Sequence, residues 1–142
     1  MIDPLDGTKE FVKRDGEFTV NIALIHQHRP VLGVVYAPVT ELCYFSTAGS
    51  CAYKAVGQES PVQIFARAQA SHPPVVVGSR SHLTEEVKSY LLRLGDYKMK
   101  SVGSSLKFCF VAEGESDLYP RLGPTSEWDT AAAQCVVESA GG

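Results

Sequence analysis

DPLDGT, at residues 3–8, is the most informative stretch of this sequence, because it places two carboxylates three positions apart directly after an apolar pair. Pro4 fixes its own φ and biases Asp3 toward an extended conformation. Gly7 permits a reversal of the backbone. We therefore predict that a strand ends at residue 2, that residues 3–8 form a tight strand-to-helix turn, and that Thr8 caps the helix that follows.

Such a turn reverses the chain and also brings groups that could bind a ligand close together. The carboxylates of Asp3 and Asp6 can converge on one point, with the backbone N–H groups of Gly7 and Thr8 pointing the same way. Carboxylates and backbone carbonyls suit hard divalent cations, and a helix N-terminus suits phosphate. The alternative is a solvated Asp-Gly turn, which such dipeptides commonly form. The stretch alone leaves both interpretations open.

The composition is that of one soluble globular domain. The chain has 142 residues, of which 44% are hydrophobic and 20% charged. The net charge of −3 argues against a general nucleic-acid or membrane-surface binder, whereas an anionic small substrate stays possible because bound cations reverse the local field. No apolar run is long enough to span a bilayer. Four cysteines in apolar runs, without a CxxC pair, predict buried free thiols and a reducing compartment.

The pattern of residues predicts a mixed α/β fold whose two halves differ. The half formed by residues 1–60 carries the turn described above and then a meander of antiparallel strands, which we place at 18–25, 31–36, 42–45 and 51–54. Residues 57–74 read as loops or a linker. The half formed by residues 75–142 alternates strand and helix, with strands at 75–77 and 97–102 and helices at 84–94, 104–112 and 128–140. Residues 118–119 read as a short extended segment.

Three further places in the sequence carry candidate chemistry. Asp129 lies in the first turn of the predicted helix 128–140, where it either complements the helix dipole or serves a site. Residues 78–82 and 103–107 each follow a predicted strand and carry Ser, Arg, His or Lys side chains that can donate to phosphate. Each loop alone is a polar surface loop; two of them together with Arg121 favour one shared anion site.

The combination of these motifs resembles the double signature of the inositol monophosphatase superfamily, which consists of lithium-sensitive, magnesium-dependent phosphatases. The signature is carried by residues 3–8, the distant WDTAA at 128–132 and the closing AGG at 140–142. The KEF continuation at residues 9–11 and further stretches are similar to the bacterial 3'(2'),5'-bisphosphate nucleotidases of that superfamily. Those stretches are residues 16–24, 33–38, 79–82, 103–109, 119–121 and 123–125.

The resemblance covers the whole chain and implies both a fold and an activity. The fold would be a layered αβαβα sandwich, incomplete at both ends, so that residues 1–142 form a single partial domain. The activity would be hydrolysis of 3'-phosphoadenosine 5'-phosphate to AMP and phosphate by metal-activated water, in sulfate assimilation. It would use two or three Mg²⁺ per complete site. The expected location is cytoplasmic, and some bacterial relatives sit on the cytoplasmic face of the inner membrane.

Site residues follow from the resemblance position by position. Mg²⁺ would be held by Asp3, the Leu5 carbonyl, Asp6 and Asp129. Asp3, Asp6 and Thr8 would be catalytic, with Thr8 orienting the attacking water. The substrate-binding positions would be Leu5, Asp6, Gly7, Thr8, His82, Ser104, Lys107, Arg121 and Asp129. Paired metals can activate water and neutralise phosphoryl charge together, so no side-chain nucleophile is required.

The sequence also departs from the family pattern. Family members carry a metal-binding Glu upstream of the DPLDGT turn and continue into further strand after the double glycine, and Ala133 stands where they usually have Gly. We therefore expect a fragment that releases phosphate far more slowly than a full-length relative. Two alternatives stay open: an inositol or sugar monophosphatase of the same superfamily, and a non-catalytic fragment that binds metal or nucleotide.

Overall fold

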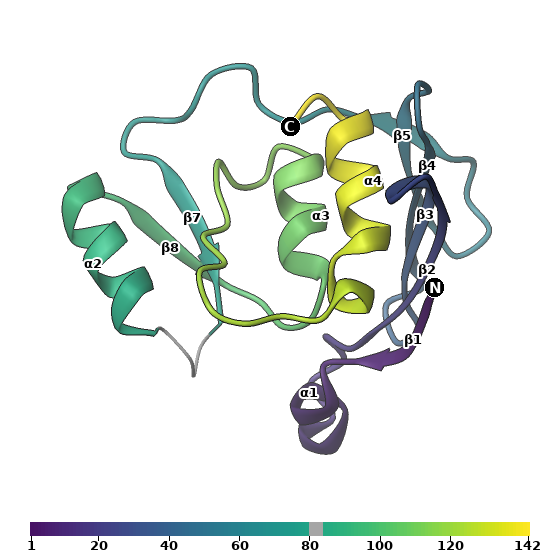
Figure 1. Ribbon diagram of the computed structural model, residues 1–142, viewed down its shortest axis with the longest axis horizontal. Helices are drawn as coiled ribbons and strands as arrows, with labels where there is room; N and C mark the ends of the chain where they lie inside the picture. Colours follow the sequence, from purple (N-terminus) through teal and green to yellow (C-terminus); the bar gives the residue numbers. More distant parts are fainter. Residues whose placement is uncertain (80–83) are drawn as a thin grey trace.

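The computed structural model, which describes residues 1–79 and 84–142, is built in four layers (Figure 1). A six-stranded antiparallel sheet forms one side of the molecule. Helices α3 (Leu106–Ala112) and α4 (Ala131–Ser139) lie against it, followed by the two-stranded parallel sheet of β7 (Val75–Gly78) and β8 (Lys98–Ser101), and then by helix α2 (Glu85–Leu94). The predicted mixed α/β class is confirmed, and four layers of the predicted sandwich are present in these residues.

The six-stranded sheet is a meander in which each strand pairs with its neighbours in the chain. Its strands are β1 (Ile2–Asp6), β2 (Thr19–His26), β3 (Arg29–Ala37), β4 (Leu42–Thr47), β5 (Ala52–Val56) and β6 (Val62–Ile64). The four strands predicted after the first turn are confirmed. β6 lies in the stretch predicted as loops or a linker; with only three residues at the sheet edge, it is too short to show an alternating pattern.

The second sheet shows the predicted alternation of strand and helix. β7 and β8 are parallel, and α2 forms the crossover between them. Thr84 caps α2, because its Oγ1 accepts a hydrogen bond from the Val87 N–H at 3.4 Å. Leu118 forms a parallel bridge to Val76, so the extended segment predicted at 118–119 is confirmed.

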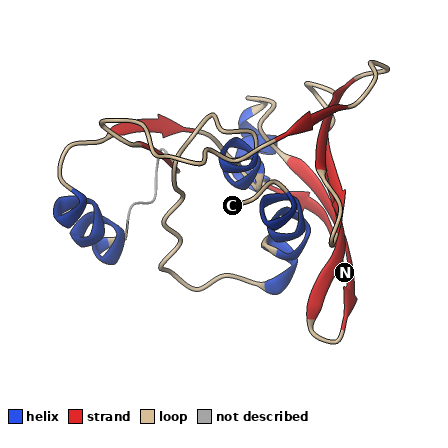
Figure 2. Ribbon diagram, turned by 90° about the horizontal axis from the view of Figure 1, so that it is seen from above, coloured by secondary structure: helices blue, strands red, loops and turns tan. Residues whose placement is uncertain are grey.

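Helix α4 packs against the six-stranded sheet, as Figure 2 shows from above. Within the sheet it contacts mainly β3. At Gly33 of β3 a Cβ atom would lie 2.1 Å from the Ala132 carbonyl oxygen. Ala132 and Ala133 are nearly fully buried, and the methyl group of Ala133 lies within the main core. The helix predicted at 128–140 is interrupted at its start, since residues Glu127–Asp129 form a 3-10 turn, η1, and Thr130 is not helical with φ −121°.

The other face of the six-stranded sheet is apolar and exposed. Ile22, Leu24 and Tyr36 are 42%, 59% and 37% exposed, while Ala23 and Val35 on the opposite face are buried in the core. The described helices α3 and α4 cover only that inner face (Figure 1). Separately, no helix in residues 1–79 and 84–142 combines the length and apolarity that crossing a bilayer requires.

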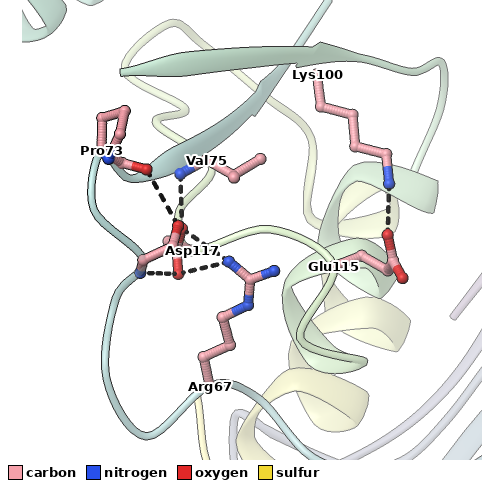
Figure 3. A network of polar contacts seen from close by, with 7 residues as sticks. Arg67, Pro73, Val75, Lys100, Glu115 and Asp117 are labelled. Carbon is pink, nitrogen blue, oxygen red and sulfur yellow. Dashed lines mark hydrogen bonds and ion pairs between the residues drawn. The ribbon is translucent and has the colours of Figure 1, made fainter. Parts of the chain in front are cut away.

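Asp117 ties the segment before β7 to the loop after α3 (Figure 3). Its side chain is only 1% exposed and accepts hydrogen bonds from Arg67 Nη1 at 3.1 Å, from the Ser71 hydroxyl at 2.5 Å and from the Val75 N–H at 2.6 Å. Burial alone would raise the pKa of this carboxyl, but the hydrogen bonds outweigh it and lower the pKa from 3.8 to about 2. Asp117 is therefore a buried anion held by several donors.

Replacing Asp117 with alanine is expected to lower the free energy of unfolding by about 2 kcal/mol, because several buried donors lose their acceptor. Denaturant unfolding at neutral pH measures this loss. Because the folded-state pKa is depressed, the stabilisation is present above pH 3.8 and is lost as the pH falls toward 2. The difference between wild type and variant should therefore shrink over that range.

Glu115→Gln is the matched control for this prediction. Glu115 pairs with Lys100 at 2.7 Å close to the Asp117 network (Figure 3), but the two side chains are 56% and 38% exposed. An exposed pair contributes little, so the free energy of unfolding should change by less than about 0.5 kcal/mol. Equal losses in the two variants would contradict the structural role given to Asp117.

Candidate active site

A bulge in β1 brings Asp3 and Asp6 to the same face of the sheet. Asp3 pairs with Asn21 and Asp6 with Thr19, so β1 uses three steps where β2 uses two. Residues three apart in a regular strand point to opposite faces, and the extra residue of a bulge corrects this. The predicted strand end at residue 2 is wrong: β1 runs to Asp6, and the turn follows it.

Gly7 makes the turn from β1 into helix α1 (Thr8–Lys13). It adopts the left-handed conformation with φ 88° and occupies the N-cap position. The predicted cap at Thr8 is therefore wrong, because Thr8 is already the first helical residue and α1 has no side-chain cap. The first N–H groups of a helix have no partner within the helix, so the amides after Asp6 can still serve an anion.

Asp129 completes a group of three carboxylates. It lies in η1, where its Oδ2 accepts hydrogen bonds from the Thr125 hydroxyl at 3.0 Å and from the Ser126 N–H at 3.2 Å. One carboxylate oxygen from each of Asp3, Asp6 and Asp129 lies within 4.8 Å of the others, and all three residues are partly buried. Side chains separated by more than 120 positions in the sequence thus meet at one point.

The electrostatics of this group suit a divalent cation. Burial raises the pKa of Asp6, and nearby Asp3 raises it further, while Lys107 and the Ser105 N–H act in the opposite direction. Burial also lowers the pKa of Lys107, against the effect of Asp6. One buried amine therefore lies near Asp6 of this carboxylate group. A set of hard oxygen donors at this spacing fits Mg²⁺, whose charge would favour the ionised carboxylates.

A small cavity of about 50 Å³ adjoins the carboxylates and brings together three of the other predicted residues. Ser104, Lys107 and Arg121 line it together with Asp6 and Asp129. Lys107 is 8% exposed and its Nζ donates to the Ser104 carbonyl at 2.6 Å.

Four predicted residues are not part of the cavity lining. Asp3 belongs to the carboxylate group, but Asp3, Leu5, Gly7 and Thr8 do not line the cavity. His82 was predicted as a substrate contact and lies outside the described residues.

A larger and more apolar cavity of about 170 Å³ lies next to this one. It is enclosed by β7, α2 and the segment 119–124, and its lining includes Val87, Leu91 and Met99. Tyr119 and Arg121 line both cavities. A ligand held by Arg121 can therefore reach from the carboxylates toward an apolar wall.

Sequence reasoning missed the residues that hold Asp6. The Ser105 N–H donates to Asp6 Oδ2 at 2.5 Å, and the side chains of Thr19 and Asn21 lie 3.4 and 3.5 Å from the same oxygen. A signal was present in the strand at 18–25, where Thr19 and Asn21 alternate with large apolar residues. Two polar residues on one face of an otherwise apolar strand indicate a buried polar site when that face is the inner one.

Comparison with known proteins agrees with this geometry. The model of the inositol monophosphatase family matches residues 1–142. The chain belongs to the inositol monophosphatase family. Within this family, its sequence is 54% identical over 141 residues to the protein named 3'(2'),5'-bisphosphate nucleotidase CysQ of Salmonella typhimurium, and 53% identical to the protein of that name in Escherichia coli K12. Each alignment covers 99% of this chain and 56% of the relative.

Solved structures of the inositol monophosphatase family show the same arrangement. The crystal structure of CysQ from Bacteroides thetaiotaomicron has a TM-score of 0.89 and 45% identity, and the match covers 99% of this chain and 58% of that one. An IMPase of Thermotoga maritima has a TM-score of 0.81 at 26% identity, covering 99% of this chain and 54% of that one. The chain thus spans about half the length of the family members that it matches.

Proposed function

We propose that this chain carries the metal and phosphate site of a phosphatase for 3'(2'),5'-bisphosphate nucleotides. The reaction would convert 3'-phosphoadenosine 5'-phosphate to AMP and phosphate, with a role in sulfate assimilation. The observation that carries the proposal is the group of three carboxylates within 4.8 Å beside a cavity lined by Lys107 and Arg121. The names of the relatives at 53–55% identity support the nucleotide as substrate. Four free thiols support a cytoplasmic location.

The carboxylates and one backbone group form the proposed cation site. Asp3, Asp6 and Asp129 would hold Mg²⁺ together with the Leu5 carbonyl, with two or three ions in a complete site. When bound, Mg²⁺ would neutralise phosphoryl charge and lower the pKa of water. The protein's own contribution is to hold three negative side chains near one another in a partly buried place, so that binding a cation relieves their repulsion.

The other residues would act on the substrate. The amides of Gly7 and Thr8 would donate to the phosphate, and the Thr8 hydroxyl would orient the attacking water. Ser104, Lys107 and Arg121 would contact the nucleotide from the cavity, and His82 is proposed for the same role from its sequence match. Two cations, Lys107 and Arg121, suit a substrate with two phosphates better than one with a single phosphate.

Phosphate release from 3'-phosphoadenosine 5'-phosphate and from inositol monophosphate, measured against Mg²⁺ concentration, tests this proposal. We expect metal-dependent release from the nucleotide and little from inositol phosphate. AMP, which keeps the base and the 5'-phosphate, is the matched control and should release none. Preference for inositol phosphate would favour the inositol monophosphatase alternative.

Calorimetry on the same chain tests the third interpretation, in which the chain is a fragment that binds metal or nucleotide without catalysis. Metal-dependent binding of the nucleotide without phosphate release would identify a non-catalytic fragment. Absence of both metal and nucleotide binding would contradict the proposed site itself.

A further inference from the structure

A chain of buried polar side chains lies between β2 and the segment that leads into α3. Thr19, Asn21 and Ser105 are 0%, 2% and 2% exposed. The Ser105 hydroxyl oxygen lies 2.7 Å from Thr19 Oγ1 and 2.7 Å from Asn21 Oδ1. Buried polar groups destabilise a core unless they are hydrogen-bonded, so three of them in contact call for a specific arrangement of their protons.

The carboxylate of Asp6 dictates that arrangement. An ionised carboxylate only accepts hydrogen bonds, so Asn21 must turn its NH₂ group toward Asp6 and its Oδ1 toward Ser105. The Ser105 hydroxyl must then donate to Asn21 Oδ1, so its own oxygen accepts the Thr19 proton at 2.7 Å. Thr19 has one hydroxyl proton, and the shorter contact to Ser105 takes it in preference to Asp6 Oδ2, which lies 3.4 Å from Thr19 Oγ1. The donors therefore run in one direction, from Thr19 to Ser105, to Asn21 and finally to Asp6.

This arrangement determines which oxygen of Asp6 is free. The Ser105 N–H at 2.5 Å and the Asn21 amide at 3.5 Å both reach Oδ2. Among residues 1–79 and 84–142, the donors found next to the Asp6 carboxylate all lie at Oδ2, which leaves Oδ1 for a cation. Hydrogen bonds to the second oxygen orient a ligating carboxylate and keep it from rotating.

We infer that Ser105 and Asn21, with Thr19 behind them, are positioning residues for the cation held by Asp6. The inference rests on the proposed function, since it assigns these residues to the same metal site. Ser105 contributes through its backbone and its side chain. Its backbone N–H donates directly to Asp6, and its hydroxyl fixes the orientation of the Asn21 amide. A purely structural role would require only that the three side chains satisfy one another inside the core.

Mn²⁺ binding by the 142-residue chain distinguishes these two roles, because Mn²⁺ accepts the same oxygen ligands as Mg²⁺. Ser105→Ala keeps the N–H to Asp6 and removes only the hydroxyl. We expect its Mn²⁺ affinity, measured by calorimetry, to fall about 10-fold, the lower end of what loss of a residue behind a metal ligand costs. Ser46→Ala is the matched control, because Ser46 of β4 is 4% exposed and its hydroxyl lies 3.3 Å from Cys135 Sγ of α4.

A second pair of variants tests the same inference if Ser105→Ala does not fold. Thr19→Val removes the hydroxyl and keeps the shape, whereas Thr19→Ser keeps the hydroxyl and removes a methyl group. Thermal unfolding reports the stability of each. We expect only Thr19→Val to weaken Mn²⁺ binding.

The outcomes separate this inference from the proposed function. Weaker Mn²⁺ binding in Ser105→Ala and Thr19→Val, with unchanged binding in Ser46→Ala and Thr19→Ser, supports the positioning role. Unchanged Mn²⁺ affinity in folded variants overturns the positioning role but not the metal site. An equal loss of affinity in Ser46→Ala also overturns the positioning role, because it would reflect general destabilisation. A wild-type chain that does not bind Mn²⁺ overturns the proposed function and this inference together.

Discussion

Asp6→Asn is expected to remove metal-dependent phosphate release and to weaken Mg²⁺ binding by at least about 100-fold. Loss of a residue behind a metal ligand costs 10- to 100-fold, and loss of a charged ligand itself should cost more. Asp6 contributes to the group of three carboxylates and to the cavity beside it, so we expect both metal binding and substrate binding to depend on it. Asparagine keeps the size, but it removes the negative charge and replaces one of the two acceptor oxygens with an NH₂ group.

Calorimetric titration with Mg²⁺ measures this loss whether or not the chain turns over substrate. Asp15→Asn is the matched control: Asp15 is exposed and its Oδ1 accepts a hydrogen bond from the Glu17 N–H at 3.1 Å, which asparagine can also accept. Its affinity for Mg²⁺ should not change. Equal affinities in wild type and Asp6→Asn would exclude Asp6 as a ligand.

Gly33→Ala is expected to lower the free energy of unfolding by about 3 kcal/mol or more, at the upper end of the cost of overpacking a core. The new Cβ would lie 2.1 Å from the Ala132 carbonyl oxygen and 2.9 Å from Cys135 Cβ. The first of these is backbone, so the clash is relieved only if α4 moves away from β3. Asp129 lies in η1, directly before that helix, and we expect Mg²⁺ affinity to fall as well.

Gly123→Ala is the control for this substitution. A Cβ at Gly123 would meet only a methyl carbon of Thr84, at 3.7 Å, which is an ordinary contact. The free energy of unfolding should change by less than about 0.5 kcal/mol, as for most substitutions at uncrowded positions. Denaturant unfolding of both variants gives the comparison, and equal stability of Gly33→Ala and wild type would mean that α4 does not pack as described.

Local chemistry accounts for the elements that could be predicted. The cap at Thr84 and the stop at Gly95 act over a few residues, and α2 lies where they place it. The strands from β2 to β5 show their alternation within each segment, and the pattern was sufficient to find them. The carboxylates of Asp3, Asp6 and Asp129 could be named as candidates because their motifs are also local.

The errors came where a partner strand overrides the local pattern. Pro4 and Gly7 predicted a turn from residue 3, but pairing with β2 extends β1 to Asp6 and absorbs the extra residue as a bulge. The cap moved from Thr8 to Gly7 for the same reason, since the strand now ends next to the glycine. β6 exists only because β5 offers it an edge.

The inner face of β2 illustrates the difference between the two levels. Hydrophobicity alone would place Ile22 and Leu24 in the core, yet they are exposed, and Thr19 and Asn21 are buried against Ser105 instead. Segment type and candidate ligands follow from interactions within a few residues, and the amino-acid order specifies these directly. The choice of face, the bulge and the meeting of Asp6 with Asp129 depend on strand register and on the close packing of α4. These features are determined by many contacts between residues far apart in the chain, and such contacts form only when the chain folds.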